Sequence, residues 1–166
     1  MNYQNQGIIV EIEKARATDA EWIDEKIRIE FPYTEFTPKK IIERMNNPKY
    51  LVLVAHQENI LTGFAEIEFF LDKKEIRLNA IYVDDAWRGQ KIATKIVEHL
   101  VEECRRVFAE RLFLLVRTSN DGAKELYEKN GFTFEKMHDK KIEGEKIEVW
   151  SRKILPQATH IRRYAS

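Results

Sequence analysis

Two cations and a glycine stand where a helix is expected to begin. Residues 87–100 read WRGQKIATKIVEHL, and Arg88, Gly89 and Lys91 precede the first helical turn. Positive side chains at this end oppose the helix dipole, which favours negative charge there. A bound phosphate would resolve the conflict, because the free N–H groups of the first turn also bind anions. The alternative is an ordinary strand-to-helix turn with solvated basic side chains.

A second stretch, residues 118–132, reads TSNDGAKELYEKNGF and predicts a short helix. Asn120 can cap the start of this helix, although Ser119 competes for that role. Gly131 tolerates a left-handed conformation and can end the helix. Taken alone, Tyr127 would be a core aromatic residue whose hydroxyl faces solvent.

Together, the two stretches resemble two motifs of the GNAT N-acetyltransferase superfamily. The first is similar to the pyrophosphate loop, Arg/Gln-x-x-Gly-x-Gly/Ala, at Arg88 and Ala93, whereas Lys91 stands where the family usually has glycine. The second is similar to the signature Asn-x-x-Ala-x-x-x-Tyr-x-x-x-Gly-Phe at Asn120, Ala123, Tyr127, Gly131 and Phe132. The order of the predicted elements also agrees with the family, so the resemblance covers nearly the whole chain.

The resemblance implies an α/β fold with a mixed sheet, of the acyl-CoA N-acyltransferase type. It also implies an enzyme that transfers acetyl from acetyl-coenzyme A (acetyl-CoA) to a primary amine of a small molecule or peptide by direct attack. Backbone groups of one strand would pair with the pantetheine arm like an added strand. The cofactor-binding residues that it implies are Ile81, Tyr82, Val83, Arg88, Gly89, Gln90, Lys91, Ile92, Ala93, Thr94, Asn120, Ala123 and Tyr127.

The resemblance also assigns candidate catalytic groups. Tyr127 occupies the position of the general acid, and a phenol with a pKa of about 10 can protonate a departing thiolate, since the thiol's own pKa is about 8.5. Many family members carry a glutamate at the position of Asn79, which cannot accept a proton but can orient a water. Glu66 or Glu68 could supply basicity through that water. The alternative is that both are solvated strand carboxylates.

Lys91 and Asn79, the two departures from the family pattern, motivate a different function. In that alternative the protein is a non-catalytic acetyl-CoA-binding sensor or partner module. The two functions differ in whether any amine accelerates thiol release from acetyl-CoA.

The acceptor amine is predicted to bind between the first two helices. Phe31, Tyr33 and Glu35 combine aromatic rings with one carboxylate, which suits an amine with an apolar body. The alternative is a hydrophobic turn packed on the sheet. The four histidines show no metal-ligand spacing, so no metal is predicted. Homodimers are common in the family, but nothing in the sequence locates an interface.

Apolar periodicity predicts the elements that must position these residues, in the order β-α-α-β-β-β-α-β-α-β-β. Strands are expected over residues 8–15, 51–55, 63–71, 75–83, 111–117, 132–137 and 146–154. The helices are expected after Thr18, Thr37, Arg88 and Ser119. The first helix should bury Trp22, Ile23, Ile27 and Ile29, and Thr37 with Pro38 should open the second.

Length and composition limit the remaining possibilities. A chain of 166 residues suggests a single domain over residues 1–155, followed by a mobile tail over 156–166. The 28 Lys and Arg balance the 28 Asp and Glu, which argues against nucleic acid as a partner. Cys104 lies in line with apolar helix positions and should be a buried, inert thiol. No signal peptide or membrane span is evident, so a cytoplasmic location is expected.

Overall fold

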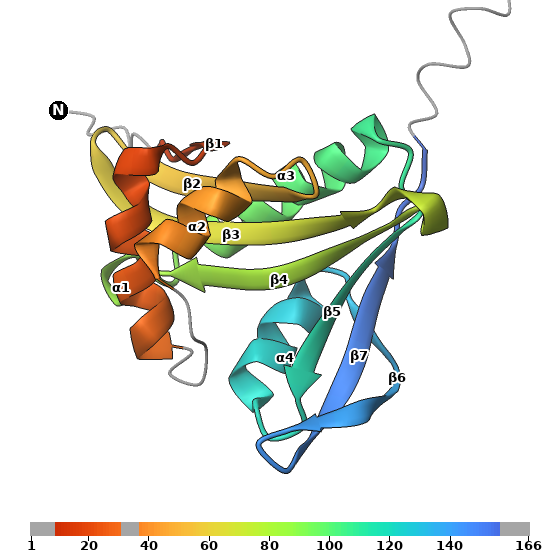
Figure 1. Ribbon diagram of the computed structural model, residues 1–166. Coiled ribbons are helices and arrows are strands. Elements are labelled where there is room, and N and C mark those ends of the chain that lie inside the picture. The colour runs from red at the N-terminus through yellow and green to blue at the C-terminus, as the bar shows by residue number, and fades with distance from the viewer. Residues whose placement is uncertain (1–8, 31–36, 157–166) are drawn as a thin grey trace, which may run out of the picture. The chain divides into compact units, whose positions relative to one another are not determined.

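The computed structural model describes residues 9–30 and 37–156, and its elements follow the predicted order (Figure 1). The strands are β1 (Glu11–Lys14), β2 (Tyr50–Gln57), β3 (Ile60–Phe70), β4 (Glu75–Val83), β5 (Arg111–Arg117), β6 (Thr133–Ile142) and β7 (Glu145–Lys153). The α-helices are α1 (Ala20–Glu30), α2 (Pro38–Met45), α3 (Ile92–Arg106) and α4 (Asp121–Lys129). Within the described residues, seven strands form one sheet in the order β1-β2-β3-β4-β5-β7-β6.

The sheet is mixed, as predicted. β4 pairs with β5 in parallel, whereas the β1–β2, β5–β7 and β6–β7 pairs are antiparallel. A parallel pair needs a long crossover, and α3 supplies it between β4 and β5. The predicted α/β fold with a mixed sheet is therefore confirmed.

The chain divides into two compact units. The first joins the chain up to Glu66 with Ala80–Ile96, and the second joins Ile67–Asn79 with the chain from Val97 onward. β3, β4 and α3 thus each contribute residues to both units. The prediction of a single domain over 1–155 stays a prediction.

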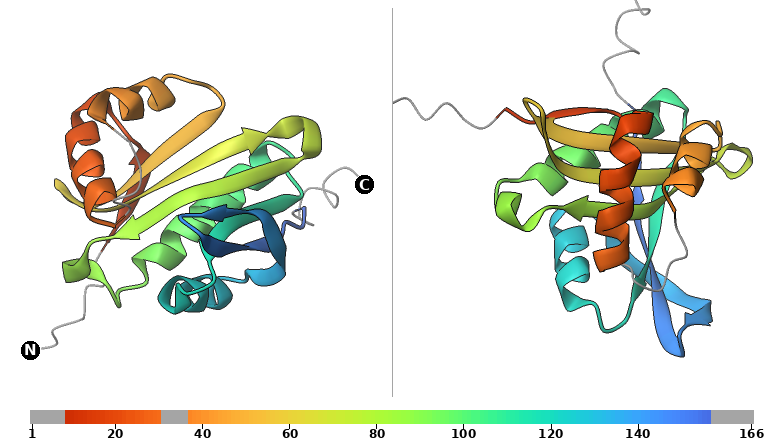
Figure 2. Two further views of the ribbon diagram at one scale, coloured as in Figure 1. Left: turned by 60° about the horizontal axis from the view of Figure 1, so that its bottom comes forward. Right: turned by 60° about the vertical axis from the view of Figure 1, so that its left-hand side comes forward.

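The core of the first unit lies between α1, α2 and the strands beside them. α1 packs against α2, and α2 packs against β2 (Figure 1 and Figure 2). The core gathers the buried side chains of Ile23, Ile27, Ile41, Val52, Val54, Phe64 and Tyr82, with Trp22 packed against them. Ile29, expected on the inner face of α1, is 63% exposed, so that expectation is wrong.

Local chemistry explains where the first two helices begin. Before α1, Asp19 closes a 3₁₀ turn and its carboxylate accepts the N–H of Arg16 at 2.8 Å. Thr37 caps α2 as predicted, because its hydroxyl accepts the N–H of Lys40 at 3.2 Å and Pro38 opens the helix.

The second unit centres on β5. Its residues Leu112, Leu114 and Val116 alternate inward and are buried, as a strand between two neighbours requires. Cys104 on α3 is fully buried, and burial raises its pKa to about 12. The prediction that Cys104 is buried is confirmed, and the raised pKa reduces the fraction of thiolate, which is the reactive form. None of the helices in the described ranges is both long and apolar enough to cross a bilayer.

Candidate active site

The turn between β4 and α3 contains two residues in left-handed conformation. After the N–H of Asp84 bonds to the carbonyl of Thr62 at 2.8 Å, a 3₁₀ turn over Asp85–Trp87 reverses the chain. Gly89 then has φ 81° and Lys91 has φ 60°. A Cβ atom at Gly89 would meet no atom within 4 Å, so this glycine is required by its conformation and not by lack of space.

The residue before the first turn of α3 is Lys91, whose side chain cannot cap the helix. The carbonyl of Lys91 accepts the N–H of Lys95 at 3.1 Å, so Lys91 is the residue before the helix. α3 itself begins at Ile92, three positions after the predicted beginning at Gly89. A lysine side chain has no acceptor atom. By helix geometry, the N–H groups of Ile92, Ala93 and Thr94 therefore have no partner within α3. The segment 88–91 is exposed, which leaves this end of the helix open to an anion.

Arg88 is held by the turn rather than fully solvated. Its Nε donates to the carbonyl oxygen of Val83 at 3.1 Å, and its guanidinium pairs with Asp85 at 2.9 Å and with Glu30 at 3.5 Å. About half of the side chain is exposed. A phosphate that binds here would replace these carboxylates as the partner of the guanidinium. Until then, the carboxylates keep the guanidinium beside the turn.

Near the end of β4, the strand before this turn, main-chain groups are more available to a ligand than the buried side chain of Tyr82. The ring of Tyr82 is buried against Phe64 and Trp22, and its hydroxyl lies 3.3 Å from a carboxylate oxygen of Asp84. Burial, together with the nearby carboxylates of Asp84 and Glu30, raises the pKa of Tyr82 to about 12. Ile92 on α3 is also fully buried. Of the predicted cofactor-binding residues, these two can offer a ligand only main-chain groups.

The start of α4 is closed by its own residues. The side-chain oxygen of Asn120 accepts the N–H of Ala123 at 3.1 Å, so Asn120 rather than Ser119 is the cap. Ser119 instead donates its N–H, at 3.1 Å, and its hydroxyl to the carboxylate of Glu145. The side-chain oxygen of Asn120 therefore caps α4, and a ligand could bind Asn120 only through its side-chain nitrogen.

The second motif surrounds Tyr127 with supporting residues. The half-buried Tyr127 ring meets the ring of Phe132 edge to face, with centroids 5.8 Å apart. Gly131 has φ 84°, and the carbonyl of Tyr127 accepts the N–H of Phe132 at 3.0 Å as the helix ends. The Gly-Phe pair thus turns the chain so that Phe132 fixes the Tyr127 ring.

The candidate base residues are buried and paired. Glu66 is 6% exposed and forms an ion pair with Arg44 of α2. Glu68 is 5% exposed, pairs with Arg77 at 2.8 Å and accepts a hydrogen bond from the amide nitrogen of Asn79 at 3.3 Å. The alternative of solvated strand carboxylates is therefore wrong.

Sequence reasoning missed both arginine partners. The alternation of β4 could have found Arg77, because it lies two residues before Asn79 on the same strand and donates to the amide oxygen of Asn79 at 2.6 Å. No signal in the sequence indicates Arg44, which reaches Glu66 from a helix 22 residues away. The predicted acceptor residues Phe31, Tyr33 and Glu35 lie outside the described residues.

Comparisons with known proteins agree with this architecture. The acetyltransferase (GNAT) family profile matches residues 11–132. The [ribosomal protein bS18]-alanine N-acetyltransferase of Escherichia coli (strain K12) is 32% identical over 102 residues, which cover 61% of this chain and 65% of that protein. The match thus spans less than two thirds of that relative's length.

Solved structures support the fold. The ribosomal-protein-S18-alanine N-acetyltransferase from Escherichia coli has a TM-score of 0.72 at 23% identity, covering 90% of this chain and 96% of that one. The PaiA N-acetyltransferase from Thermoplasma acidophilum, solved in complex with coenzyme A, has a TM-score of 0.73 at 19% identity, covering 87% and 99%. The chain belongs to the GNAT family of acetyltransferases.

Proposed function

We propose that the protein transfers the acetyl group of acetyl-CoA to a primary amine of a small molecule or a peptide. The observation that carries this proposal is the exposed start of α3, where the side chain of Lys91 cannot cap the helix and Arg88 lies beside the turn. Three amides without a partner inside the helix, together with a guanidinium, match the oxygen atoms and the charge of a diphosphate. Acetyl-CoA carries such a diphosphate, and the family to which the chain belongs uses it as the acetyl donor.

The reaction needs one bond formed and one broken. The neutral amine attacks the thioester carbonyl carbon, a C–N bond forms, and the C–S bond breaks to release coenzyme A. We assign to Tyr127 the proton that the departing sulfur receives, because the edge contact with Phe132 holds its ring in place. The amine loses a proton in the same process, so a second group must accept it.

Glu68 is the better supported candidate for accepting that proton. Asn79 donates directly to the Glu68 carboxylate and could hold a water beside it. Arg77 pairs with the same carboxylate oxygen, so proton transfer to Glu68 would weaken this ion pair. Glu66 is likewise ion-paired, with Arg44, so what distinguishes Glu68 is its hydrogen bond from Asn79.

The acceptor is the least constrained part of the proposal. The name of the Escherichia coli relative specifies an alanine of a ribosomal protein as its acceptor. We therefore include a peptide with an N-terminal alanine among the candidate amines, beside free amino acids, polyamines and aminoglycosides.

A substrate panel tests the proposal. Release of free thiol from acetyl-CoA is measured for each amine, with wild-type protein and with Tyr127→Phe. We expect at least one amine to accelerate thiol release, and Tyr127→Phe to lower turnover by about 10²-fold without changing acetyl-CoA affinity. Tight binding of acetyl-CoA with no acceleration by any amine would instead favour the non-catalytic binding module.

A further inference from the structure

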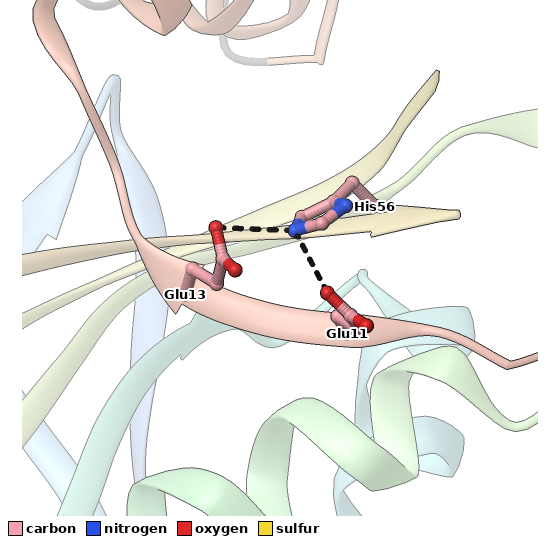
Figure 3. A group of neighbouring side chains, drawn as sticks. All are labelled: Glu11, Glu13 and His56. Atoms are coloured by element: carbon pink, nitrogen blue, oxygen red, sulfur yellow. Dashed lines mark ion pairs between the residues drawn. The ribbon is translucent and has the colours of Figure 1, made fainter. Parts of the chain in front are cut away.

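Two glutamates and a histidine meet on the first two strands. Glu11 and Glu13 are two residues apart on β1 and share one of its faces, and His56 of β2 stands directly opposite Glu11 in the antiparallel register. One ligand atom from each residue lies within 4.8 Å of the others. Figure 3 shows both carboxylates turned toward the same ring nitrogen of His56.

The other ring nitrogen determines the state of His56. Its Nδ1 lies 2.8 Å from the carbonyl oxygen of Glu58, and because a carbonyl only accepts, Nδ1 must carry the hydrogen. In the neutral ring, Nε2 then presents a lone pair. Nε2 is buried and has no hydrogen-bond partner within the described residues. It lies 3.2 Å from an oxygen of Glu13 and 3.8 Å from an oxygen of Glu11.

A lone pair facing two carboxylate oxygens is repulsive unless a positive charge lies between them. That charge is either a proton on Nε2 or a metal ion. Histidines that bind metals almost always donate their other ring N–H to a carbonyl or carboxylate, which fixes the ring as Glu58 fixes His56. The arrangement therefore has the orienting bond of a metal ligand as well as the donor atoms.

We propose that Glu11, Glu13 and His56 bind a divalent transition-metal ion, of which Zn²⁺ is the representative. Imidazole nitrogen and carboxylate oxygen are both common Zn²⁺ ligands, and three protein ligands with a water complete a tetrahedron. Bonds of that kind place neighbouring ligand atoms about 3.3 Å apart, close to the 3.2 Å from Nε2 to Glu13. Glu11 is 62% exposed and is therefore able to close its slightly longer gap.

The site would act on structure rather than on acetyl transfer. None of its three residues belongs to the groups assigned to acetyl-CoA or to catalysis. β1 has only four residues and pairs with β2, so a metal held by both strands would fasten the short strand. Binding to the folded state alone also raises the stability of the protein, and this gain grows with the logarithm of the metal concentration once that concentration exceeds the dissociation constant.

Metal titration of the full chain tests this proposal. Metal-free protein at pH 7.5 is titrated with Zn²⁺ by calorimetry, and thermal unfolding is followed with and without Zn²⁺. We expect one Zn²⁺ per chain and a higher melting temperature, and at least a tenfold loss of affinity in both His56→Gln and Glu13→Gln. The matched control His138→Gln changes a histidine of β6 outside the cluster and should bind like wild type.

Two results would overturn the metal site. One is the absence of Zn²⁺ binding by wild-type protein. The other is equal Zn²⁺ binding by wild type and by folded His56→Gln and Glu13→Gln proteins.

Discussion

The starts of α3 and α4 solve the same problem in opposite ways. Every helix begins with N–H groups that lack partners inside the helix. At α4, Asn120 accepts one of them, and Glu145 fixes the preceding Ser119. At α3, the starting residue is Lys91, which accepts nothing through its side chain and sits in a left-handed conformation. One helix start receives an acceptor from its own cap, and the other is where we propose that the diphosphate binds.

The difference has an energetic meaning. A good cap stabilises a helix by about 1 kcal/mol, and an L-residue in left-handed conformation costs roughly 1–2 kcal/mol. α3 therefore gives up stability at its start, whereas α4 retains it. Strained or incomplete local structure often marks a functional site. Substitutions at the start of α3 should then change binding more than stability, and those at the start of α4 should do the reverse.

Of the substitutions at the two helix starts, Arg88→Glu should have the largest effect, and this effect should be on coenzyme A affinity. The substitution replaces a guanidinium with a carboxylate at the proposed diphosphate site, and charge-assisted hydrogen bonds contribute about 1.5–3 kcal/mol. We expect coenzyme A affinity, measured by calorimetry, to fall by about 10- to 100-fold or more. The melting temperature should change little, because Arg88 pairs with exposed carboxylates.

Arg106→Glu is the matched control, since it reverses an exposed charge at the other end of α3. It should leave coenzyme A affinity near the wild-type value. Equal losses of affinity in both proteins would point to overall charge rather than to a site at the start of α3.

Asn120→Ala should lower stability more clearly than it lowers coenzyme A affinity. Removing the oxygen that accepts the Ala123 N–H should lower the free energy of unfolding by about 1 kcal/mol. Asn120→Asp keeps an acceptor and should recover most of this loss. Chemical denaturation measures the stability, and calorimetry measures coenzyme A binding. A large loss of affinity in both variants would show instead that the Asn120 amide contacts the cofactor.

Lys91→Gly should have a smaller effect, and its sign is informative. Glycine accepts the left-handed conformation without penalty but is more flexible when unfolded, so we expect a net stabilisation of about 0.5–1 kcal/mol. Coenzyme A affinity should fall a few-fold, because an ammonium beside the diphosphate is lost. A rise in affinity would mean that the lysine side chain obstructs the approach of the ligand.

Glu145→Gln should have the smallest effect, present near neutral pH and lost at acidic pH. Hydrogen bonds from Ser119 hold the pKa of Glu145 below its ordinary value of 4.5. Such a group stabilises the fold fully above the unfolded-state pKa and loses this contribution as pH falls through the lowered folded-state pKa. Melting temperatures of wild type and Glu145→Gln should therefore differ at pH 6 and converge toward pH 3. If the difference in melting temperature stayed constant between pH 6 and pH 3, protonation of Glu145 would not explain any loss of stability in acid.

The sequence was sufficient for the fold because local signals agreed with one another. The strand-like apolar segments 75–83 and 111–117 predicted β4 and β5 with their observed bounds, and Thr37-Pro38 predicted the start of α2. The two motifs also identified the turn before α3 and the helix that carries Tyr127. Helix bounds were less certain where backbone conformation decides, as at α3, which begins at Ile92 because Gly89 and Lys91 are left-handed.

Long-range pairing could not be predicted in the same way. Burial of Glu66 and Glu68 depends on arginines that the fold brings to them, and one of these lies on α2. Glu11 and His56 meet only because β1 and β2 pair in a particular register. From sequence alone, a charged residue on a strand is predicted to face solvent, because burial requires a partner that the sequence does not identify.

The most direct test follows the backbone amides at both helix starts by NMR while ligand is added. Coenzyme A is compared with pantetheine, which lacks the diphosphate. We expect coenzyme A alone to produce large shifts of the Ile92, Ala93 and Thr94 amide signals, with smaller shifts of Asp121 to Ala123. If pantetheine moves the α3 amides equally, or if coenzyme A leaves them unmoved, the start of α3 is not the diphosphate site.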